Sequence, residues 1–393
     1  MPSYYLAATL ARLADEMVAF TLVLLVLDRT DSPALAGITG AAYALPAVVT
    51  GPLLGAWLDR TPYRRSALAL NQAVLGVVML SLLAVVGHSA HWIAPALAAV
   101  AGATLPMVSG GFTSMLPSLV PRARLARANS LEAASFGAAT ITGPATAATI
   151  AATVSVEAAV LVIAVAAVLS ICAITQLPAL PPAGTDGEPF MASVIGGLTH
   201  LARTPRLRAS TVTTTLLMGM TGILLITLPL HTAALGMPRS AAGYLWTALE
   251  IGSIATALLL GRLQTRWRPE HVVMASVAAY GLALTTWPLA ASFAVLLLLA
   301  ALSGLLEGPT LPAMFAARQR YSPEALQGRV STTAASLRVG AAALGQAAGG
   351  LLVPAIGTDR ALLVVAVGLV AAAVLGRVAA ISRKAAAPAV SRG

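Results

Sequence analysis

One stretch decides the fold of this chain: Gly55-Ala56-Trp57-Leu58-Asp59-Arg60-Thr61-Pro62-Tyr63-Arg64-Arg65. It carries one acid and three arginines, and it lies between two long apolar runs. A charged side chain at the centre of a membrane costs at least about 2.5–3.5 kcal/mol on insertion scales, so four of them mark a membrane boundary. The stretch therefore predicts a loop outside the bilayer, and arginines beside helix ends favour the cytoplasmic side.

The composition of the whole chain is that of a membrane protein. Of the 393 residues, 58% are hydrophobic and 10% are charged, whereas about 25% are charged in soluble domains. The net charge of +10 does not indicate nucleic-acid binding, because the arginines sit in short loops between apolar runs. The only cysteine, Cys172, lies in an apolar run. We therefore expect no disulfide, no metal site and no cofactor.

Twelve apolar runs have the length of about 20 residues that a spanning helix needs. The predicted spans are 5–27, 33–57, 66–87, 92–116, 128–154, 157–178, 209–234, 241–263, 271–290, 293–316, 330–356 and 360–381. The N-terminus lacks the features of a cleaved signal peptide, so the first predicted helix is expected to stay. The sequence thus predicts an all-α membrane protein with twelve transmembrane helices.

The charges of the loops give these helices a direction. Nineteen lysine and arginine residues fall on the side that holds both termini, whereas the other side has only Arg29, Arg239 and Arg360. The positive-inside rule therefore places both termini in the cytoplasm. All five tryptophans fall near predicted helix ends, as expected for an aromatic belt. Abundant arginine and alanine suggest a GC-rich bacterial genome, and hence a multi-pass protein of the bacterial plasma membrane.

A run rich in proline and glycine, followed by an amphipathic piece, divides the chain. The predicted parts are a six-helix half, a cytoplasmic linker, a second six-helix half and a cytoplasmic tail: 1–178, 179–208, 209–382 and 383–393. The halves look related, because Pro121–Arg127 resembles Pro323–Arg329 at a distance of 202 residues. Duplicated halves are an expected feature of transporters with a central site.

Twelve helices in two such halves, with a basic loop after the second helix, resemble the major facilitator superfamily. The family pattern of that loop is Gly-x-Leu-Ala-Asp-Arg-x-Gly-Arg-Lys, and the matching residues are Gly55, Asp59, Arg60 and Arg64. Pro62 and Tyr63 depart from the pattern. The resemblance implies that this loop, Arg65 included, forms a cytoplasmic gate. Asp59 would latch onto the helix that begins near Arg329, whose N-terminal dipole attracts negative charge.

Two further stretches, Leu119–Ser130 and Gln327–Val330, resemble the drug-efflux branch of the superfamily, which is related to macrolide exporters. Gly143 and Pro144 resemble the antiporter motif of the fifth helix, although alanines stand where the family has further glycines. The resemblance implies a proton antiporter that exports drug-like molecules.

Ionisable side chains inside predicted spans are functional candidates, because they are costly in a membrane. Eight lie away from the span ends: Arg12, Asp15, Glu16, Glu132, His231, Glu250, Glu307 and Arg338. For two of them we expect other roles. Glu132 would answer nearby cytoplasmic arginines, and His231 would be a solvated histidine near the outer end of its helix.

The first span carries three charges, with Arg12 one turn from Glu16 and three residues from Asp15. Burial raises the pKa of a carboxyl group and a nearby arginine lowers it, so such a group can load and release a proton during transport. The alternative is a static ion pair whose members only neutralise each other. Asp15 also matches a recurrent acid of the first helix in the efflux branch.

The candidate with the most favourable position in the second half is Glu307. It lies about midway along 293–316 and is followed by Gly308 and Pro309, which loosen the helix backbone. In the superfamily this tenth helix lines the central cavity, so the resemblance implies a role for Glu307 in the site.

Glu250 and Arg338 are the other charges deep in the second half. Glu250 has Gly252 and Ser253 beside it, so it either joins the site or bonds across a helix interface. Arg338 is always charged and needs a carboxylate or an anionic ligand. We expect Glu307 or Glu250 to pair with it; if it bound the substrate instead, the substrate would be anionic.

These observations predict a secondary active transporter that rocks two halves around a central site. The favoured activity is proton-coupled efflux of amphipathic or drug-like molecules, with Asp15 and Glu307 carrying protons and Arg12 and Arg338 tuning them. Proton-coupled uptake of a sugar or other metabolite, and a non-transporting receptor or scaffold, stay open. The sequence has no ATP-binding loop and no hydrolase or metalloprotease motif, so we do not expect the protein to be an enzyme. The expected partners of this monomer are a small molecule, protons and lipid.

Overall fold

The computed structural model describes residues 2–178, 190–264 and 267–381. Some side chains within its helices, those of Asp59 and Arg60 among them, also lie outside the described part. Throughout the described residues the chain forms only helices and their connections. Eight helical segments there are long and apolar enough to cross a membrane, judged by length and composition. The predicted class, an all-α membrane protein, is confirmed.

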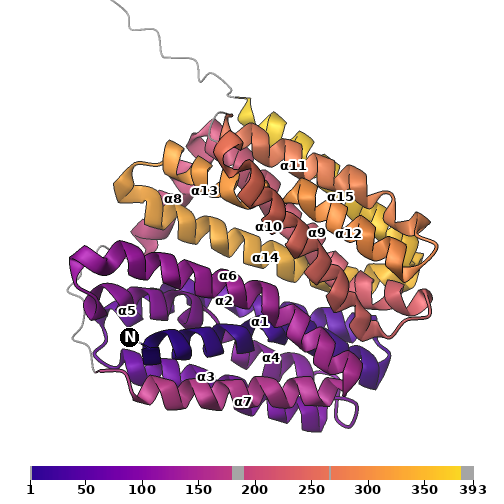
Figure 1. The fold of residues 1–393 in the computed structure, drawn as a ribbon, viewed down its shortest axis with the longest axis horizontal. Coiled ribbons are helices and arrows are strands. Elements are labelled where there is room, and N and C mark those ends of the chain that lie inside the picture. Colours follow the sequence, from indigo (N-terminus) through magenta and orange to yellow (C-terminus); the bar gives the residue numbers. More distant parts are fainter. Residues whose placement is uncertain (1, 179–189, 265–266, 382–393) are drawn as a thin grey trace, which may run out of the picture.

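The helices lie in two groups, one below the other in Figure 1. The first group, indigo to magenta, consists of α1 Pro2–Thr30, α2 Pro33–Arg60, α3 Arg64–Val85, α4 Ile93–Thr104, the π-helix η1 Met107–Gly111, α5 Phe112–Leu119, α6 Arg122–Thr153 and α7 Val156–Thr175. The second group, pink to yellow, consists of α8 Phe190–Arg203, α9 Pro205–Ala234, η2 Arg239–Ala241, α10 Ala242–Gln264, α11 Pro269–Leu284, η3 Trp287–Leu289, α12 Phe293–Glu307, α13 Thr310–Tyr321, α14 Glu324–Ile356 and α15 Thr358–Ala380.

Two pairs of helices form most of the contact between the groups: α2 packs against α14, and α6 packs against α10. Glycines bring the backbones close. A Cβ atom added to Gly350 of α14 would lie 2.5 Å from the carbonyl oxygen of Pro33, and one added to Gly243 would lie 2.0 Å from the Cβ of Ala148. Small residues at helix contacts are a common basis of helix association in membranes.

The two ends of the molecule differ in how the groups are joined. We call them the Arg239 end, which holds the α1–α2 turn and η2, and the Arg64 end, which holds the α2–α3 turn and the start of α1. One apolar core runs through both groups, and it includes Leu25 of α1 and Leu228 of α9, near the Arg239 end. Toward the Arg64 end the cores are separate: one cluster belongs to the first group alone and three small ones to the second.

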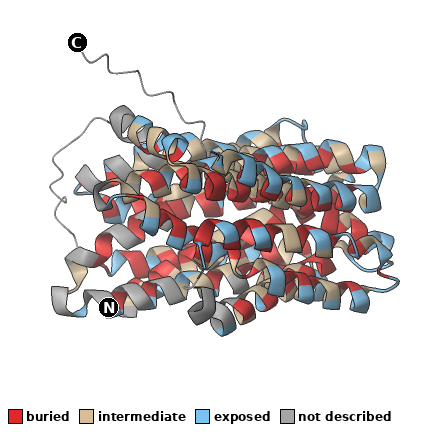
Figure 2. Ribbon diagram, turned by 90° about the horizontal axis from the view of Figure 1, so that it is seen from above, coloured by how far each residue is buried: buried red, intermediate tan, exposed pale blue. Residues whose placement is uncertain are grey.

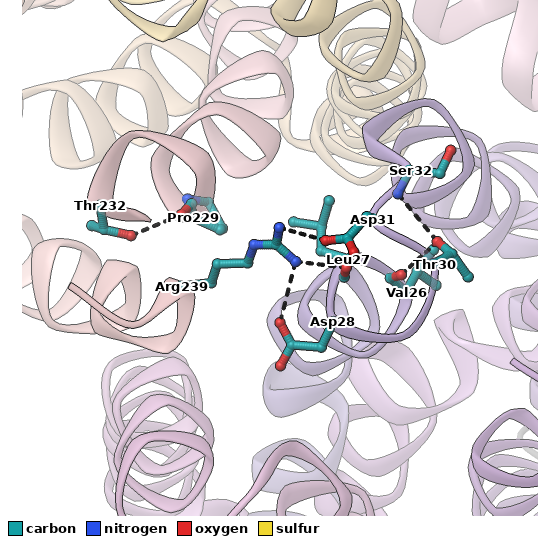
Figure 3. Close-up of polar contacts among 9 residues, drawn as sticks. All are labelled: Val26, Leu27, Asp28, Thr30, Asp31, Ser32, Pro229, Thr232 and Arg239. Carbon is teal, nitrogen blue, oxygen red and sulfur yellow. Dashed lines mark hydrogen bonds and ion pairs between the residues drawn. The ribbon is translucent and has the colours of Figure 1, made fainter. Parts of the chain in front are cut away.

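Arg239 bridges the two groups at its end of the molecule (Figure 3). Its guanidinium donates hydrogen bonds to the carbonyl oxygen of Leu27 and to the carboxylate of Asp31, both at 2.7 Å, and lies 3.6 Å from the carboxylate of Asp28. Where both side chains are described, the hydrogen bonds and ion pairs that cross between the groups all involve Arg239.

Most of the stretch 55–65, which was predicted to be a loop, is helical. Helix α2 continues to Arg60, and only Thr61–Tyr63 connect it to α3. Thr61 has extended backbone angles, as expected for a residue that precedes a proline, so Pro62 sets the end of the helix. The charged stretch therefore lies mostly on helix ends.

Two predicted spans are broken helices, and proline stands at each break. The span 92–116 contains a π-helical turn that follows Pro106, and such turns often mark functional sites. The span 293–316 breaks at Gly308 and Pro309, between α12 and α13. The sequence predicted a loosened backbone beside Glu307 within one span, and the structure has a break there.

The predicted linker 179–208 is partly helical. Helix α8 fills its second part and α9 begins at Pro205, within the predicted linker rather than after it; residues 179–189 lie outside the described residues. The N-terminal end of α9 begins early because proline is favoured at the first position of a helix.

Both groups expose many large apolar side chains, and exposed residues are spread along the helices in Figure 2. Leu289, Leu259 and Val367 are examples, and contact with lipid would explain their exposure. Trp287 does not follow the expected aromatic belt. It is fully buried, and its Nε1 donates a hydrogen bond to the Ser303 hydroxyl, 3.0 Å away.

Candidate functional site

Four carboxylates from the two groups of helices form one charged region, which we call the acid cluster. Asp15 and Glu16 lie on α1, Glu250 lies on α10, and Glu307 is the last residue of α12. Glu250 is within electrostatic range of both Glu307 and Glu16, so the cluster reaches across the boundary between the groups. All four residues have intermediate exposure. The structure therefore brings together acids that are more than 200 residues apart in the sequence.

Glu16 faces α6. The hydroxyl of Thr140 donates a hydrogen bond of 3.1 Å to the Glu16 carboxylate. A Cβ atom added to Gly143 would lie 2.6 Å from the Cβ of Glu16, so only a residue without a side chain lets α6 lie this close. Pro144 follows inside the same helix. Gly143, one of the two residues predicted from the fifth-helix motif, thus lies at the contact between α6 and Glu16.

Asp15 faces α2. The hydroxyl of Tyr43 lies 3.5 Å from the Asp15 carboxylate, at the limit for a hydrogen bond, and the tyrosine is buried. One turn before Tyr43, Gly40 packs against the side chain of Gln346 on α14. The partner of Asp15 is therefore carried by a helix that also forms the boundary between the groups.

Arg12 has its partners on α6 and not on α1. It forms an ion pair with Glu132 and donates a hydrogen bond of 3.0 Å to Ser135, with both ions buried. The guanidinium also lies 5.1 Å from the ring centroid of Phe136. Among the described contacts Arg12 does not pair with Asp15 or Glu16, although it shares the α6-facing side of the helix with Glu16. Direct pairing as the means of tuning these acids is therefore not observed.

Glu307 is held at the end of α12. The hydroxyl of Ser253 on α10 donates a hydrogen bond of 3.0 Å to its carboxylate. A Cβ atom added to Gly308 would lie 2.3 Å from the carbonyl oxygen of Ser253, so the two backbones touch at this point. Ser253 follows Glu250 closely in the sequence, but its hydroxyl bonds to Glu307.

Arg338 on α14 stands beside the cluster without an ion pair. Its Nη1 is 3.2 Å from the Sδ atom of Met314. Glu307 is within electrostatic range, yet none of the described carboxylates lies within 4.0 Å of Arg338. The expected ion pair with Glu307 or Glu250 is therefore not present.

The basic residues of the charged stretch hold helix ends. The Nε of Arg64 donates a hydrogen bond of 2.7 Å to the carbonyl oxygen of Leu58, and Nη1 of Arg65 donates one of 3.0 Å to that of Leu177, just beyond α7. Carbonyl groups at C-terminal helix ends lack partners within the helix, and cations are favoured there. The surroundings of three predicted gate residues lie outside the described part of the structure: Gly55, Asp59 and Arg60. The Asp59 latch stays a prediction.

His231 differs from its expected role. It is buried, and its Nδ1 lies 3.3 Å from both the hydroxyl of Thr358 and the carboxylate of Asp359, at the start of α15. The expectation of a solvated histidine was wrong because the end of α9 packs against α15.

Sequence reasoning missed Tyr43 and Thr140 as hydroxyl partners of the acids, and it noted Ser253 beside Glu250 without predicting its bond to Glu307. The available signal was a hydroxyl group in an otherwise apolar span, because such a group needs a hydrogen-bond partner inside a membrane. Within the described residues, His, Cys, Asp and Glu nowhere form a group of three or more that could hold a metal ion.

An all-helical membrane protein with two packed groups of helices, and with charged residues of both groups between them, has the architecture of a membrane transporter. Residues 4–238 and 211–392 each match the Major Facilitator Superfamily, and the chain belongs to this family. It is also 31% identical, over 359 residues, to a protein described as the uncharacterized MFS-type transporter y4rN of Sinorhizobium fredii (strain NBRC 101917 / NGR234). That match covers 89% of this chain and 88% of the relative.

Solved structures of transporters have the same fold. The nucleoside transporter NupG has a TM-score of 0.77 at 13% identity, covering 96% of this chain and 99% of its own. A bacterial homolog to the human lysosomal transporter Spinster, in an inward-facing and unoccupied conformation, has a TM-score of 0.70 at 13% identity, covering 96% and 95%. An auto inhibited POT family peptide transporter has a TM-score of 0.73 at 12% identity, covering 100% and 98%. At such low identities these matches establish the fold alone.

Proposed function

We propose that this protein is a proton-coupled secondary transporter that exports amphipathic or drug-like small molecules by alternating access. The observation that carries the proposal is the acid cluster, whose members come from both groups of helices and keep partial exposure at their boundary. Carboxylates in a membrane interior are costly, and in transporters they mark proton and substrate pathways. Movement of one group against the other would change the surroundings of all four acids together.

Membrane topology gives the proposed cycle its direction. With twelve spans in two six-helix halves and both termini in the cytoplasm, the Arg239 end faces outward and the Arg64 end faces the cytoplasm. The joined Arg239 end then corresponds to a state closed toward the outside. Export requires the opposite state, in which the Arg239 end opens and the Arg64 end closes.

Within the cluster we assign proton transfer to Asp15 and Glu307. Asp15 adjoins the boundary helix α2 through Tyr43, and Glu307 terminates α12 at a Gly-Pro break, so both are placed to respond to helix movement. Glu16 and Glu250 would set the local charge around them. Arg12 holds α1 to α6 in this proposal, because its charge is already taken up by Glu132.

The test uses inside-out membrane vesicles that contain the protein. An imposed proton gradient should drive accumulation of an amphipathic compound, and Asp15→Asn and Glu307→Gln should reduce this accumulation to background at normal membrane levels. Glu157→Gln is the matched control, because Glu157 pairs with Arg29 at the start of α7, away from the cluster. Transport by Asp15→Asn and Glu307→Gln proteins at the wild-type rate would refute the assignment.

The same vesicles separate the alternatives. Proton-driven accumulation only in right-side-out vesicles would identify uptake of a metabolite. A receptor or scaffold would move nothing in either orientation and would tolerate neutral residues at all four positions of the cluster. We prefer export because the stretches Leu119–Ser130 and Gln327–Val330 resemble the efflux branch, and because Gly143 and Pro144 resemble the antiporter motif of the fifth helix.

A further inference from the structure

Two arginines outside the acid cluster share a single sulfur atom. Nη2 of Arg318, on α13, is 3.3 Å from the Sδ of Met314, and Nη1 of Arg338, on α14, is 3.2 Å from the same atom. Met314 is 2% exposed and Arg318 is 5% exposed, so this contact lies inside the second group of helices. Two positive charges thus converge on one neutral thioether.

This arrangement leaves both guanidinium groups poorly satisfied. A thioether is a weak acceptor, and arginine keeps its charge in proteins. None of the described carboxylates lies within 4.0 Å of either arginine, and the buried Nε of Arg338 has no hydrogen-bond partner. Among the described residues, the other polar or ring contact of the Arg318 side chain is with Phe315, 5.7 Å from the ring centroid. Buried charges are normally paired or hydrogen-bonded, so the described residues leave these two charges without an ionic partner.

We propose that Arg318 and Arg338 bind an anionic oxygen group, a carboxylate or a phosphoryl group, of the transported molecule. A guanidinium presents a planar fork of donors that matches the oxygens of such groups, and two forks from different helices can hold one group from two sides. Met314 is flexible enough to yield its position between them. The inference rests on the proposed transport function and gives its substrate a charge: an amphipathic molecule with an anionic head.

The surroundings of Arg338 connect this anion site to the acid cluster. Arg338 is partly exposed and lies within electrostatic range of Glu307, so an anion bound to Arg338 would compete electrostatically with the Glu307 carboxylate. Arg318 lies deeper, one turn before the end of α13, and supplies the second fork. A substrate held there would therefore act electrostatically, through Arg338, on the residue that we assign to proton transfer.

The test measures binding to the purified full-length protein in nonionic detergent, by thermal stabilisation. The probes are benzoate and inorganic phosphate, with benzylammonium as the cation matched in size to benzoate. Benzoate or phosphate should stabilise the wild-type protein, because a ligand of the native state raises its apparent stability. Arg318→Gln and Arg338→Gln should weaken the apparent affinity by about ten-fold or more, as expected when a hydrogen bond to a charged group is lost.

Three comparisons keep the result specific. Arg320→Gln should bind like wild type, because Arg320 is an exposed arginine on the same helix. Arg318→Lys and Arg338→Lys keep the positive charge but lose the planar set of donors, so their affinities should fall between those of wild type and the glutamine variants. The lysine variants also replace a glutamine variant that fails to fold. Equal responses in all variants, or stabilisation by benzylammonium alone, would overturn the proposal. Arginine-dependent stabilisation by phosphatidylglycerol but by neither small anion would overturn it in favour of a lipid headgroup.

Failure of this inference is distinguishable from failure of the transport proposal. If vesicles with Arg318→Gln and Arg338→Gln still accumulate an amphipathic compound like wild type, while Asp15→Asn vesicles do not, the anion site is wrong and the transporter stands. If the arginines bind benzoate or phosphate in a protein that transports nothing, the anion site stands and the proposed function is wrong.

Discussion

The Arg239 end and the Arg64 end hold the two groups of helices together by different means. At the Arg239 end the groups share an apolar core, an arginine that bonds across the boundary, and backbone contacts at Gly350 and Gly243. At the Arg64 end each group has a core of its own, and Arg65 bonds within its own group. The groups can therefore part at the Arg64 end without breaking a shared core, whereas parting at the Arg239 end requires its loss.

This difference indicates where the stability of the observed state resides. In the proposed cycle the protein also adopts a state that is open at the Arg239 end and closed at the Arg64 end. That state loses the shared core and the contacts of Arg239, and new contacts at the Arg64 end must compensate for them. Changes that weaken the Arg239 end should therefore expose it to solvent without unfolding either group. Opening can be measured by thiol labelling of Ala36→Cys, since Ala36 is fully buried in the shared core. The exposed native cysteine is first removed by Cys172→Ser.

The largest effect is expected from Gly350→Ala in this labelling background. The added Cβ would lie 2.5 Å from the carbonyl oxygen of Pro33, and the neighbouring atoms are backbone atoms that cannot yield. Overpacking of this kind costs about 1–3 kcal/mol, so labelling at position 36 should rise roughly ten-fold or more. Gly137→Ala is the control, because a Cβ at Gly137 meets nothing within 4 Å. Equal labelling of the two variants would mean that the α2–α14 contact does not keep this end closed.

A smaller effect is expected from Arg239→Gln. Its hydrogen bonds to Leu27 and Asp31 cross between the groups, but the pair is partly exposed, which limits its contribution to about 1 kcal/mol. Labelling at position 36 should rise about five-fold. Arg29→Gln is the matched control, because Arg29 bonds Leu83 and Glu157 within the first group. The Arg29→Gln variant should have lower thermal stability but unchanged labelling at position 36. If its labelling rose as much as that of Arg239→Gln, the Arg239 end would open through a general loss of stability and not through loss of contacts between the groups.

The sequence predicted the helical membrane class because apolar runs between charged loops leave few alternatives. It also indicated Asp15, Glu16, Glu250 and Glu307, because charges inside apolar spans stand out. It did not predict which partner each charge would take. Spacing places Arg12 and Glu16 on one side of a helix, but the register of α6 against α1 decides that Arg12 pairs with Glu132.

The anion site shows the same limit of sequence reasoning. Arg318 lies just beyond the predicted span 293–316, so the sequence assigns it to a loop, whereas the structure buries it beside Met314. Its burial depends on how α13 packs against α11, and that packing brings together segments about 40 residues apart. Sequence pattern and residue spacing describe one helix at a time, so they do not predict contacts between helices.

Asp59→Asn tests the Arg64 end, where the family resemblance implies a latch. If Asp59 stabilises closure by facing the N-terminal end of α14, losing its charge should raise the labelling of cysteines on α14 between Arg329 and Leu337. A charge at a helix terminus contributes about 0.3–1 kcal/mol, so the expected rise is about two- to five-fold. Asp359→Asn is the control, since Asp359 lies in the first turn of α15 at the opposite end. Unchanged labelling in Asp59→Asn would remove the latch from the proposed cycle.

The smallest effect is expected from Arg65→Gln, and it should be local. Arg65 is exposed and donates hydrogen bonds to the carbonyl oxygens of Thr175 and Leu177, both at the end of α7 in its own group. Losing them should speed hydrogen exchange in the last turn of α7 by about two- to five-fold, the range for a cation at a C-terminal helix end. Labelling at position 36 should stay at the wild-type level, because no contact between the groups is removed. If Arg65→Gln changed that labelling as well, the two ends would be coupled through the body of the first group, and the Arg64 end could not be treated as free to part on its own.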